Sequence, residues 1–252
     1  MQLSYDSVQP PPTAGLIVLS VDRTVEADLR ALVPADALSL CHTRIESAPD
    51  VSAASLTAMA ERLPGAAALL PGGLRAIGYA CTSGALMIGE ERVEALIGEA
   101  HPGVATTNPL SALKAACAGL GVRRLGLLSP YVAEVSDGLR AHLAENGIEV
   151  TAFASFDEEN EARVARIAPR SIAEGLRQLA GQGGCDALFA SCTGLRAVEA
   201  IGAVERELGL PVLASNQVLA WHLLQLTGHP WPHQDALTGA PLIPSPPVGG
   251  EG

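Results

Sequence analysis

Two cysteines in similar surroundings are the residues of this chain whose types and spacing best suit chemistry. The segment IGYACTSGAL carries Cys81-Thr82-Ser83-Gly84, and the segment LFASCTGLRA carries Cys192-Thr193-Gly194. In each segment an apolar run typical of a buried strand stops at a Cys-Thr pair, and a glycine and a helical pattern follow. Two related strand-to-helix turns, one in each half of the chain, predict a duplicated α/β unit in which two thiols face one cleft.

Thiols in such turns are suited to acid–base and nucleophilic chemistry. A helix start presents unpaired N–H groups and a positive dipole end, which lower a thiol pKa, so we expect Cys81 and Cys192 to ionise readily. Two facing thiols can move protons, or make and break one covalent bond, on both faces of a small molecule. The hydroxyls of Thr82, Ser83 and Thr193 suit the binding of a carboxylate. Simple core packing of a buried cysteine is the alternative for each thiol.

The other candidate residues stand in less informative patterns. Cys41, Cys117 and Cys185 are expected to pack in the core. Tyr131 follows a strand end, so its phenol could donate a hydrogen bond into the cleft or lie at the surface. Asn160 lies beyond another strand end, and the pattern alone is typical of a solvated loop.

Apolar runs and helical patterns alternate along the chain and predict the elements that position these residues. Strands are expected at residues 14–20, 37–43, 74–80, 124–129, 148–154, 186–191 and 211–214. Helices are expected over 52–63, 84–98 and 171–180, after the Asn108-Pro109 and Ser129-Pro130 pairs, and over 195–208 and 215–228. This alternation predicts an α/β protein with two Rossmann-like lobes, parallel sheets, pseudo-two-fold symmetry and an active site at the lobe interface.

The domain organisation follows from the same pattern. The N-terminal lobe is expected to comprise residues 1–114 and 215–252, and the C-terminal lobe residues 115–214. The first twelve residues are expected to form an arm, and the Pro- and Gly-rich residues 229–252 a loose tail.

Composition excludes several classes of function. The chain has 252 residues, a net charge of -11 and only 3% aromatic residues, so no nucleic acid is expected as a partner. No apolar run approaches a membrane span, and nothing resembles a signal peptide. The odd number of cysteines, without a CxxC pair, indicates reduced thiols and a cytoplasmic protein. Neither a phosphate-binding glycine motif nor a metal-binding histidine spacing is present, so we expect no nucleotide cofactor and no metal.

Taken together, these segments resemble the aspartate/glutamate racemase superfamily, in particular its branch of maleate cis-trans isomerases and arylmalonate decarboxylases. The resemblance spans roughly residues 14–228. It is carried by GYACTSGAL, LGLLSPYVAEV, DEENEARVARIAP, and ALFASCTGLRAVEAI followed by ERELGLPVLASNQ. It implies an enzyme without a cofactor, in which two cysteines meet at the lobe interface.

The resemblance also implies roles for the cysteines. In maleate isomerases one thiolate is thought to add to the double bond and the second thiol assists elimination, which makes Cys81 the nucleophile and Cys192 the acid/base. Racemases use the two thiols as opposed acid and base. Arylmalonate decarboxylases keep the second cysteine and have glycine at the first position, so the presence of Cys81 argues against that chemistry here.

The residues that would hold the substrate carboxylates are also carried over from the resemblance. They are Thr82, Ser83, Tyr131, Asn160 and Thr193, together with the backbone N–H groups of Cys192 and Thr193.

The first strand departs from the pattern of the isomerases. They have an asparagine in a run similar to SxNTTxE, where this chain has SVDRTVE and places Asp22 at the asparagine position. A carboxylate there would repel a second carboxylate of the substrate, unless Arg23 offsets it or the ligand carries an amine. Amino-acid racemases of the branch, including those tied to ectoine breakdown, therefore stay an alternative.

We therefore expect a cofactor-independent two-cysteine isomerase or racemase of a small carboxylate, with maleate-type cis-trans isomerisation as the specific prediction. Decarboxylation of a malonate-like acid through Cys192 alone is a second hypothesis, and a small-carboxylate binding or sensor module is a non-enzymatic one. Homo-oligomerisation is compatible with the sequence.

Overall fold

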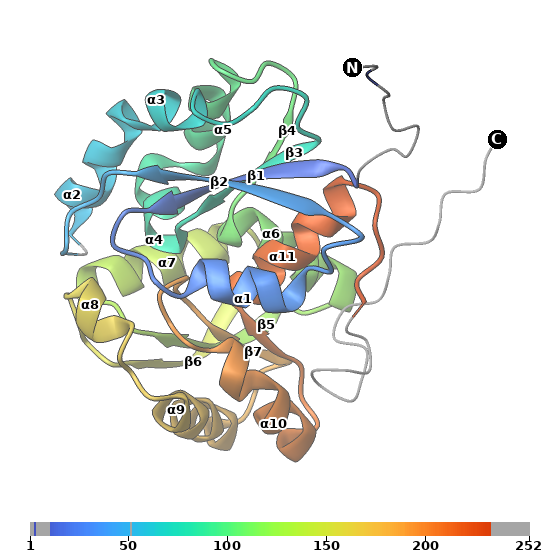
Figure 1. The fold of residues 1–252 in the computed structure, drawn as a ribbon. Helices are drawn as coiled ribbons and strands as arrows, with labels where there is room; N and C mark the ends of the chain where they lie inside the picture. Colours follow the sequence, from blue (N-terminus) through green and yellow to red (C-terminus); the bar gives the residue numbers. More distant parts are fainter. Residues whose placement is uncertain (1–2, 4–10, 51, 233–252) are drawn as a thin grey trace.

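The first sheet is built from apolar segments of the N-terminal half. The computed structural model describes residues 3, 11–50 and 52–232, and Figure 1 shows their arrangement. Strands β1 (Thr13–Leu19), β2 (Ser39–Ile45), β3 (Ala76–Ala80) and β4 (Ala105–Thr107) pair in parallel in the order β2-β1-β3-β4. The central strands β1 and β3 are almost entirely buried, as expected for a parallel sheet covered on both faces.

The second sheet repeats this plan. Strands β5 (Arg124–Ser129), β6 (Glu149–Ser155), β7 (Ala187–Ala190) and β8 (Val212–Ala214) pair in parallel in the order β6-β5-β7-β8. Each strand of the second sheet thus occupies the position of one strand of the first, with β7 in the place of β3. The predicted α/β class with two parallel-sheet lobes is confirmed.

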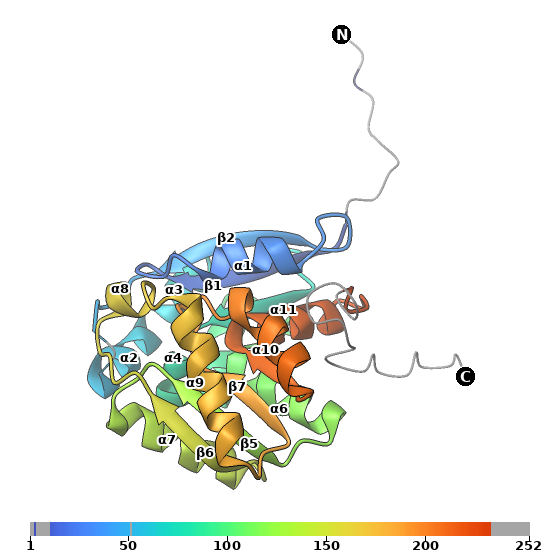
Figure 2. The same cartoon turned by 90° about the horizontal axis from the view of Figure 1, so that it is seen from below.

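Helices cover both sheets and fill the space between them. The helices are α1 (Val25–Leu32), α2 (Ala53–Ala58), α3 (Leu63–Ala67), α4 (Thr82–Ile88), α5 (Glu90–Gly98), α6 (Pro109–Leu120), α7 (Ala133–Glu145), α8 (Glu161–Val164), α9 (Pro169–Gln182), α10 (Val198–Leu208) and α11 (Ser215–Leu226). In Figure 1, α1 and α11 lie between the sheets, while α2, α3 and α5 lie beyond the first sheet. Figure 2 shows α9 and α10 across the outer face of the second sheet.

Several predicted helices differ from the observed ones. The helix expected over residues 84–98 is two helices, because Gly89 adopts a φ of 91° between α4 and α5. The helix expected over 52–63 is likewise interrupted, by a 3-10 turn at Met59–Glu61. The cap expected at Ser129-Pro130 is wrong, since α7 begins at Ala133, and β4 and α8 were not expected.

The last helix packs with the first lobe. Helix α11 lies against α1, α6, β3 and β4. The predicted lobe boundary between residues 114 and 115 falls inside α6, and the assignment of chain segments to domains stays a prediction.

The predicted arm and tail lie largely outside the described residues. Residues 229–232 are described, and two of them, His229 and Trp231, are held against the protein, whereas Pro230 and Pro232 are exposed. The His229 N–H donates to the Leu224 carbonyl at 2.8 Å, and Trp231 is 2% exposed. None of the helices in the described ranges combines the length and the apolar character needed to cross a membrane.

Candidate active site

Cys81 stands at the junction of β3 and α4. It is the N-cap residue of α4, and its sulfur accepts a hydrogen bond from the Gly84 N–H at 3.1 Å. The Ser83 hydroxyl lies 3.7 Å from the same sulfur. A Cβ at position 84 would lie 2.5 Å from the Tyr79 hydroxyl and 2.9 Å from the Cys81 sulfur, so only glycine lets this turn close over the thiol.

Cys192 follows β7, the counterpart of β3, but its turn has a different shape. The residue has a φ of 110°, an unusual value for a residue with a side chain. Its sulfur accepts from the Gly194 N–H at 3.3 Å. Helix α10 begins only at Val198, so the prediction that Cys192 directly precedes a helix start is wrong. Residues 193–197 separate the thiol from the start of the helix.

Hydrogen bonds join the two turns across the lobe interface. The Thr193 hydroxyl donates to the Ala80 carbonyl at 3.3 Å, directly before Cys81. Ser215, the first residue of α11, accepts the Cys192 N–H at 3.0 Å and lies 2.9 Å from the Thr82 hydroxyl. These hydrogen bonds therefore fix the position of each Cys-Thr turn relative to the other.

The two thiols share the same neighbours. The Tyr131 hydroxyl is fully buried, hydrogen-bonds to the Cys192 sulfur, and interacts electrostatically with both cysteines. Asp22 and Glu161 also interact electrostatically with both. The two cysteines therefore lie near the same charged and polar groups.

Burial dominates the ionisation of the thiols. Cys81 is 3% exposed and Cys192 is 4% exposed. Burial, and to a smaller extent the Glu161 carboxylate, raise the pKa of Cys81 to about 12, against the lowering effect of the Gly84 N–H. The same two causes raise the pKa of Cys192 well above its usual value. The expectation of lowered thiol pKa values is therefore wrong, since the effect of desolvation exceeds that of the local hydrogen bonds.

Glu161 is a site residue that the sequence reasoning missed. It is the first residue of α8, and burial together with the nearby Asp22 raises its pKa to about 7. Its neighbour Asn160 caps α8 instead, with its side-chain oxygen accepting the Arg163 N–H at 3.2 Å. Among the described residues no contact joins Asn160 to a thiol, and its role in binding stays a prediction.

The remaining predicted site residues are engaged in local hydrogen bonds. Asp22 Oδ1 accepts the N–H groups of Thr24 at 2.7 Å and Val25 at 3.0 Å, so Asp22 caps the start of α1. The hydroxyls of Thr82 and Thr193 hold the interface described above. Ser83 is buried, and its hydroxyl is hydrogen-bonded to the Cys81 sulfur.

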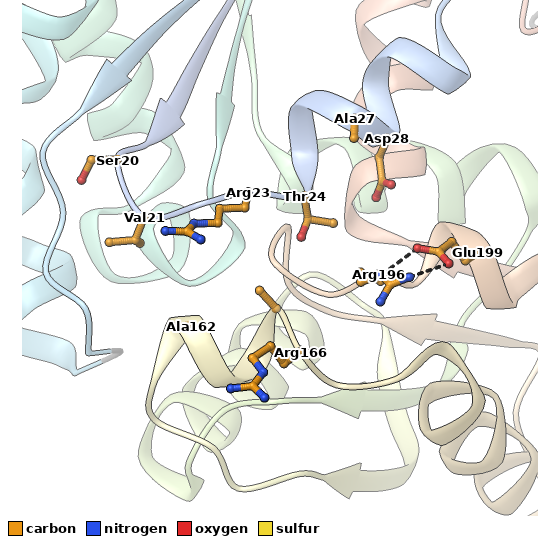
Figure 3. Close-up of a pocket in the computed structure, with 11 residues that line it drawn as sticks. Ser20, Val21, Arg23, Thr24, Ala27, Asp28, Ala162, Arg166, Arg196 and Glu199 are labelled. Atoms are coloured by element: carbon orange, nitrogen blue, oxygen red, sulfur yellow. Dashed lines mark hydrogen bonds and ion pairs between the residues drawn. The ribbon is translucent and has the colours of Figure 1, made fainter.

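A cavity of about 550 Å³ opens on the far side of the Cys192 turn. Figure 3 shows three arginines around it: Arg23 after β1, Arg166 after α8, and Arg196 before α10. Arg196 is paired with Glu199 at 2.7 Å. The cavity does not include the thiols, but Thr24 on its wall donates its hydroxyl to the Gly194 carbonyl at 2.9 Å. It therefore adjoins the site at the mouth between the lobes.

Each thiol has groups beside it that stabilise its ionised form. Donors reach each sulfur, and Tyr131 stabilises the ionised form of Cys192. Within the described ranges no group of three or more His, Cys, Asp or Glu side chains could hold a metal ion.

A family comparison covers nearly the whole chain. A sequence model described as arylmalonate decarboxylase matches residues 15–237.

Individual relatives come from two kinds of enzyme. The chain is 33% identical over 110 residues to the arylmalonate decarboxylase of Bordetella bronchiseptica, a match that covers 43% of this chain and 46% of that protein. The chain therefore matches less than half of that relative. It is 27% identical over 228 residues to the maleate isomerase of Nocardia farcinica, which covers 84% of this chain and 88% of the relative.

A solved structure shows the same fold. It is a cysteine-to-serine variant of the Nocardia farcinica maleate cis-trans isomerase with a covalently bound succinylcysteine intermediate. It superposes with a TM-score of 0.78 at 24% identity, covering 91% of this chain and 96% of that chain.

Proposed function

The chain belongs to the arylmalonate decarboxylase family, and we propose that it is a cofactor-independent isomerase that acts on a small carboxylate through Cys81 and Cys192. Maleate-type cis-trans isomerisation is the specific reaction that we propose first. A relative named maleate isomerase that is matched over 88% of its length supports this choice.

One observation carries the proposal. The two cysteines end equivalent strands, β3 and β7, and their turns are hydrogen-bonded to one another across the lobe interface. A single structural thiol would need no such counterpart. Two thiols that share Tyr131 as a neighbour suit chemistry on both faces of one ligand.

The proposed reaction begins with the Cys81 thiolate. Its sulfur adds to one carbon of the double bond, and the electron pair moves onto the other carbon and its carboxylate, where Cys192 delivers a proton. Rotation about the new single bond follows. Cys192 then removes a proton, the double bond re-forms, and the bond between sulfur and carbon breaks to release the trans acid. Atoms and electrons balance, and no oxidant is used.

The surrounding groups would stabilise the charges that develop. The Gly84 N–H and the Ser83 hydroxyl stabilise the Cys81 thiolate, and Tyr131 and the Gly194 N–H stabilise the Cys192 thiolate. Ser83 and the Thr193 backbone N–H are the donors that we assign to a substrate carboxylate. Thr82 would act by positioning, through Ser215.

Racemisation of an amino acid is the second candidate, and a specific observation favours it: two carboxylates, Asp22 and Glu161, stand beside the thiols. Decarboxylation through Cys192 alone is less compatible with a thiol at position 81. A homo-oligomeric state and a cytoplasmic location stay predictions.

The test compares Cys81→Ser and Cys192→Ser with the wild type, using maleate in D₂O followed by proton NMR. The turnover number of each variant should fall by about a thousandfold or more. The two thiols act together, so the loss of either one abolishes the reaction. Cys185→Ser, a half-buried cysteine outside the site, serves as the matched control and should keep wild-type turnover. Retention of maleate turnover in Cys81→Ser would contradict the two-thiol reaction.

A further inference from the structure

Helix α11 holds the backbone of the Cys192 turn through its first two residues. The Cys192 N–H donates to the Ser215 hydroxyl at 3.0 Å. The side-chain amide of Asn216 donates to the next carbonyl of the turn, that of Thr193, at 2.9 Å. Two successive residues of one helix therefore bind two successive residues of the turn.

Helix α1 acts on the same turn through two side chains. Thr24 is the N-cap residue of α1, yet its hydroxyl makes no capping bond and donates instead to the Gly194 carbonyl at 2.9 Å. Asp28 lies four residues later, and so on the same face of the helix, and its carboxylate accepts the Asn216 amide at 2.7 Å. Figure 3 shows Thr24 at the start of α1 and Asp28 one turn further on. One side chain of α1 thus contacts the turn directly, and the other acts on it through Asn216.

The Asn216 amide is the link between α1 and the turn. Its nitrogen carries two hydrogen atoms, and its two partners, the Asp28 carboxylate and the Thr193 carbonyl, are both acceptors. Its oxygen is buried and has no donor among the described residues. The orientation of this side chain therefore depends on those two hydrogen bonds. Neither a carboxylate nor a single hydroxyl at position 216 could donate both of them.

The Cys192 turn has a conformation that needs such support. Cys192 has a φ of 110°, and a residue with a side chain keeps an angle of this kind only where its surroundings determine it. Asp28 is 9% exposed and forms no ion pair with any described residue, and burial raises its pKa to about 6. Because burying a carboxylate without an ion pair disfavours folding, the contribution of Asp28 is to the orientation of Asn216 rather than to net stability.

We propose, on the premise that Cys192 performs the acid–base step assigned above, that Asn216 is a positioning residue that holds the Cys192 turn in its reactive conformation. Asp28 orients the Asn216 amide, and the amide fixes the carbonyl that follows Cys192. The sulfur then stays where the Gly194 N–H and the Tyr131 hydroxyl reach it. Without this link the turn relaxes and the thiol opens to solvent.

The test breaks the link in the full-length chain in two ways. In Asn216→Ser the single hydroxyl hydrogen serves at most one of the two acceptors. Asp28→Leu removes the acceptor that orients Asn216, and because it also removes a buried charge it should keep the fold. Asp28→Asn is the conservative variant, since its amide oxygen still accepts the Asn216 amide. Asn146→Ser, at the exposed end of α7, is the matched control.

The first measurement is the initial rate at which iodoacetamide labels each cysteine of the folded protein, followed by peptide mapping. A buried thiol reacts through local opening, so the loss of one supporting hydrogen bond should raise the labelling rate of Cys192 by about tenfold in Asn216→Ser and Asp28→Leu. The labelling rate of Cys81 should change by less than about twofold, because its own turn is intact. Asp28→Asn and Asn146→Ser should label as the wild type does.

The second measurement is turnover of maleate. Displacement of the Cys192 sulfur should lower kcat by about tenfold or more in Asn216→Ser and Asp28→Leu. Asp28→Asn should restore kcat to within about twofold of the wild type, because it keeps the acceptor without the charge.

Three results would count against the inference or its premise, and they are distinguishable. Unchanged Cys192 labelling in both variants, or labelling that rises equally at Cys81 and Cys192, would show that Asn216 does not hold the turn. Selective labelling of Cys192 with an unchanged kcat would overturn the positioning role. Maleate turnover that survives in Cys81→Ser and Cys192→Ser, or that is absent from the wild type, would instead reject the proposed function. The labelling rates would then still decide whether Asn216 holds the turn.

Discussion

Each thiol of the site is held by a backbone N–H group from the turn that follows it. Gly84 donates to Cys81 and Gly194 donates to Cys192. These bonds favour the thiolate, yet burial outweighs them and raises the pKa of both thiols. The charge of a ligand bound beside the thiols would therefore shift their pKa values as well.

Glu161 provides a prediction about pH and stability. Its pKa is about 7 in the folded protein against 4.5 as the ordinary value, so folding favours its protonated form. The stability that this provides is complete below about pH 4.5 and is lost as the pH rises through 7. Glu161→Gln should therefore be more stable than the wild type at pH 8, by about 1–3 kcal/mol after allowance for its partial exposure.

Urea unfolding at pH 5 and pH 8 measures this difference. The gain should be clearly larger at pH 8, where the wild-type carboxylate is ionised beside Asp22. Exposed Glu94→Gln, on α5, is the control and should show no such gain. An equal effect of Glu161→Gln at both pH values would show that Glu161 is not desolvated.

At the scale of single residues, the sequence indicates which thiols and hydroxyls lie close together. It does not indicate which carboxylates lie beside them. The repeated Cys-Thr pattern pointed to Cys81 and Cys192, and Tyr131 lies beside them. Glu161 was missed because Asn160 precedes it: the asparagine side chain is used to cap α8, and the next residue turns toward the site. That outcome depends on where a one-turn helix begins, which no local periodicity reveals.

At the scale of the element, the β3–α4 turn depends on the absence of a side chain at Gly84. An added Cβ would lie 2.5 Å from the Tyr79 hydroxyl, 2.9 Å from the Cys81 sulfur and 3.0 Å from the end of Met59. All three contacts are buried, so relief requires movement of the turn itself.

Gly84→Ala should therefore destabilise the protein by about 1–3 kcal/mol through overpacking. It should also reduce kcat, since the Cys81 sulfur is displaced. Gly98→Ala, where no atom lies within 4 Å of the added carbon, is the matched control and should leave stability unchanged or raise it. Thermal unfolding and the turnover assay measure both effects. Normal stability and kcat in Gly84→Ala would refute a tightly closed turn.

Element types were more predictable than element ends. The apolar runs that deliver Cys81 and Cys192 are strands, as their periodicity indicates. The end of α4 at Gly89 and the late start of α10 were not foreseen. Both follow from backbone angles at single residues, a φ of 91° at Gly89 and of 110° at Cys192. Glycine adopts a positive φ at little cost, whereas a cysteine rarely does, so the angle at Cys192 is not predictable from its residue type.

At the scale of the whole molecule, two parallel sheets with the same strand order bring equivalent turns together. The alternation of strands and helices was sufficient to predict this plan, because βαβ connections leave few topologies open. Contacts between lobes were not predictable. Glu90 of α5, for example, pairs with His142 of α7 at 2.9 Å.

The central claim is that the Cys81 and Cys192 sulfurs open into one pocket, and prolonged alkylation with iodoacetate tests it most directly. Peptide mapping, combined with intact mass measurement, counts the carboxymethyl groups on these two cysteines in each molecule. Because the first group would occupy the shared space and add a negative charge, we predict that a folded molecule is modified at one of the two cysteines but not at both. Folded molecules modified at Cys81 and Cys192 together would contradict the shared pocket.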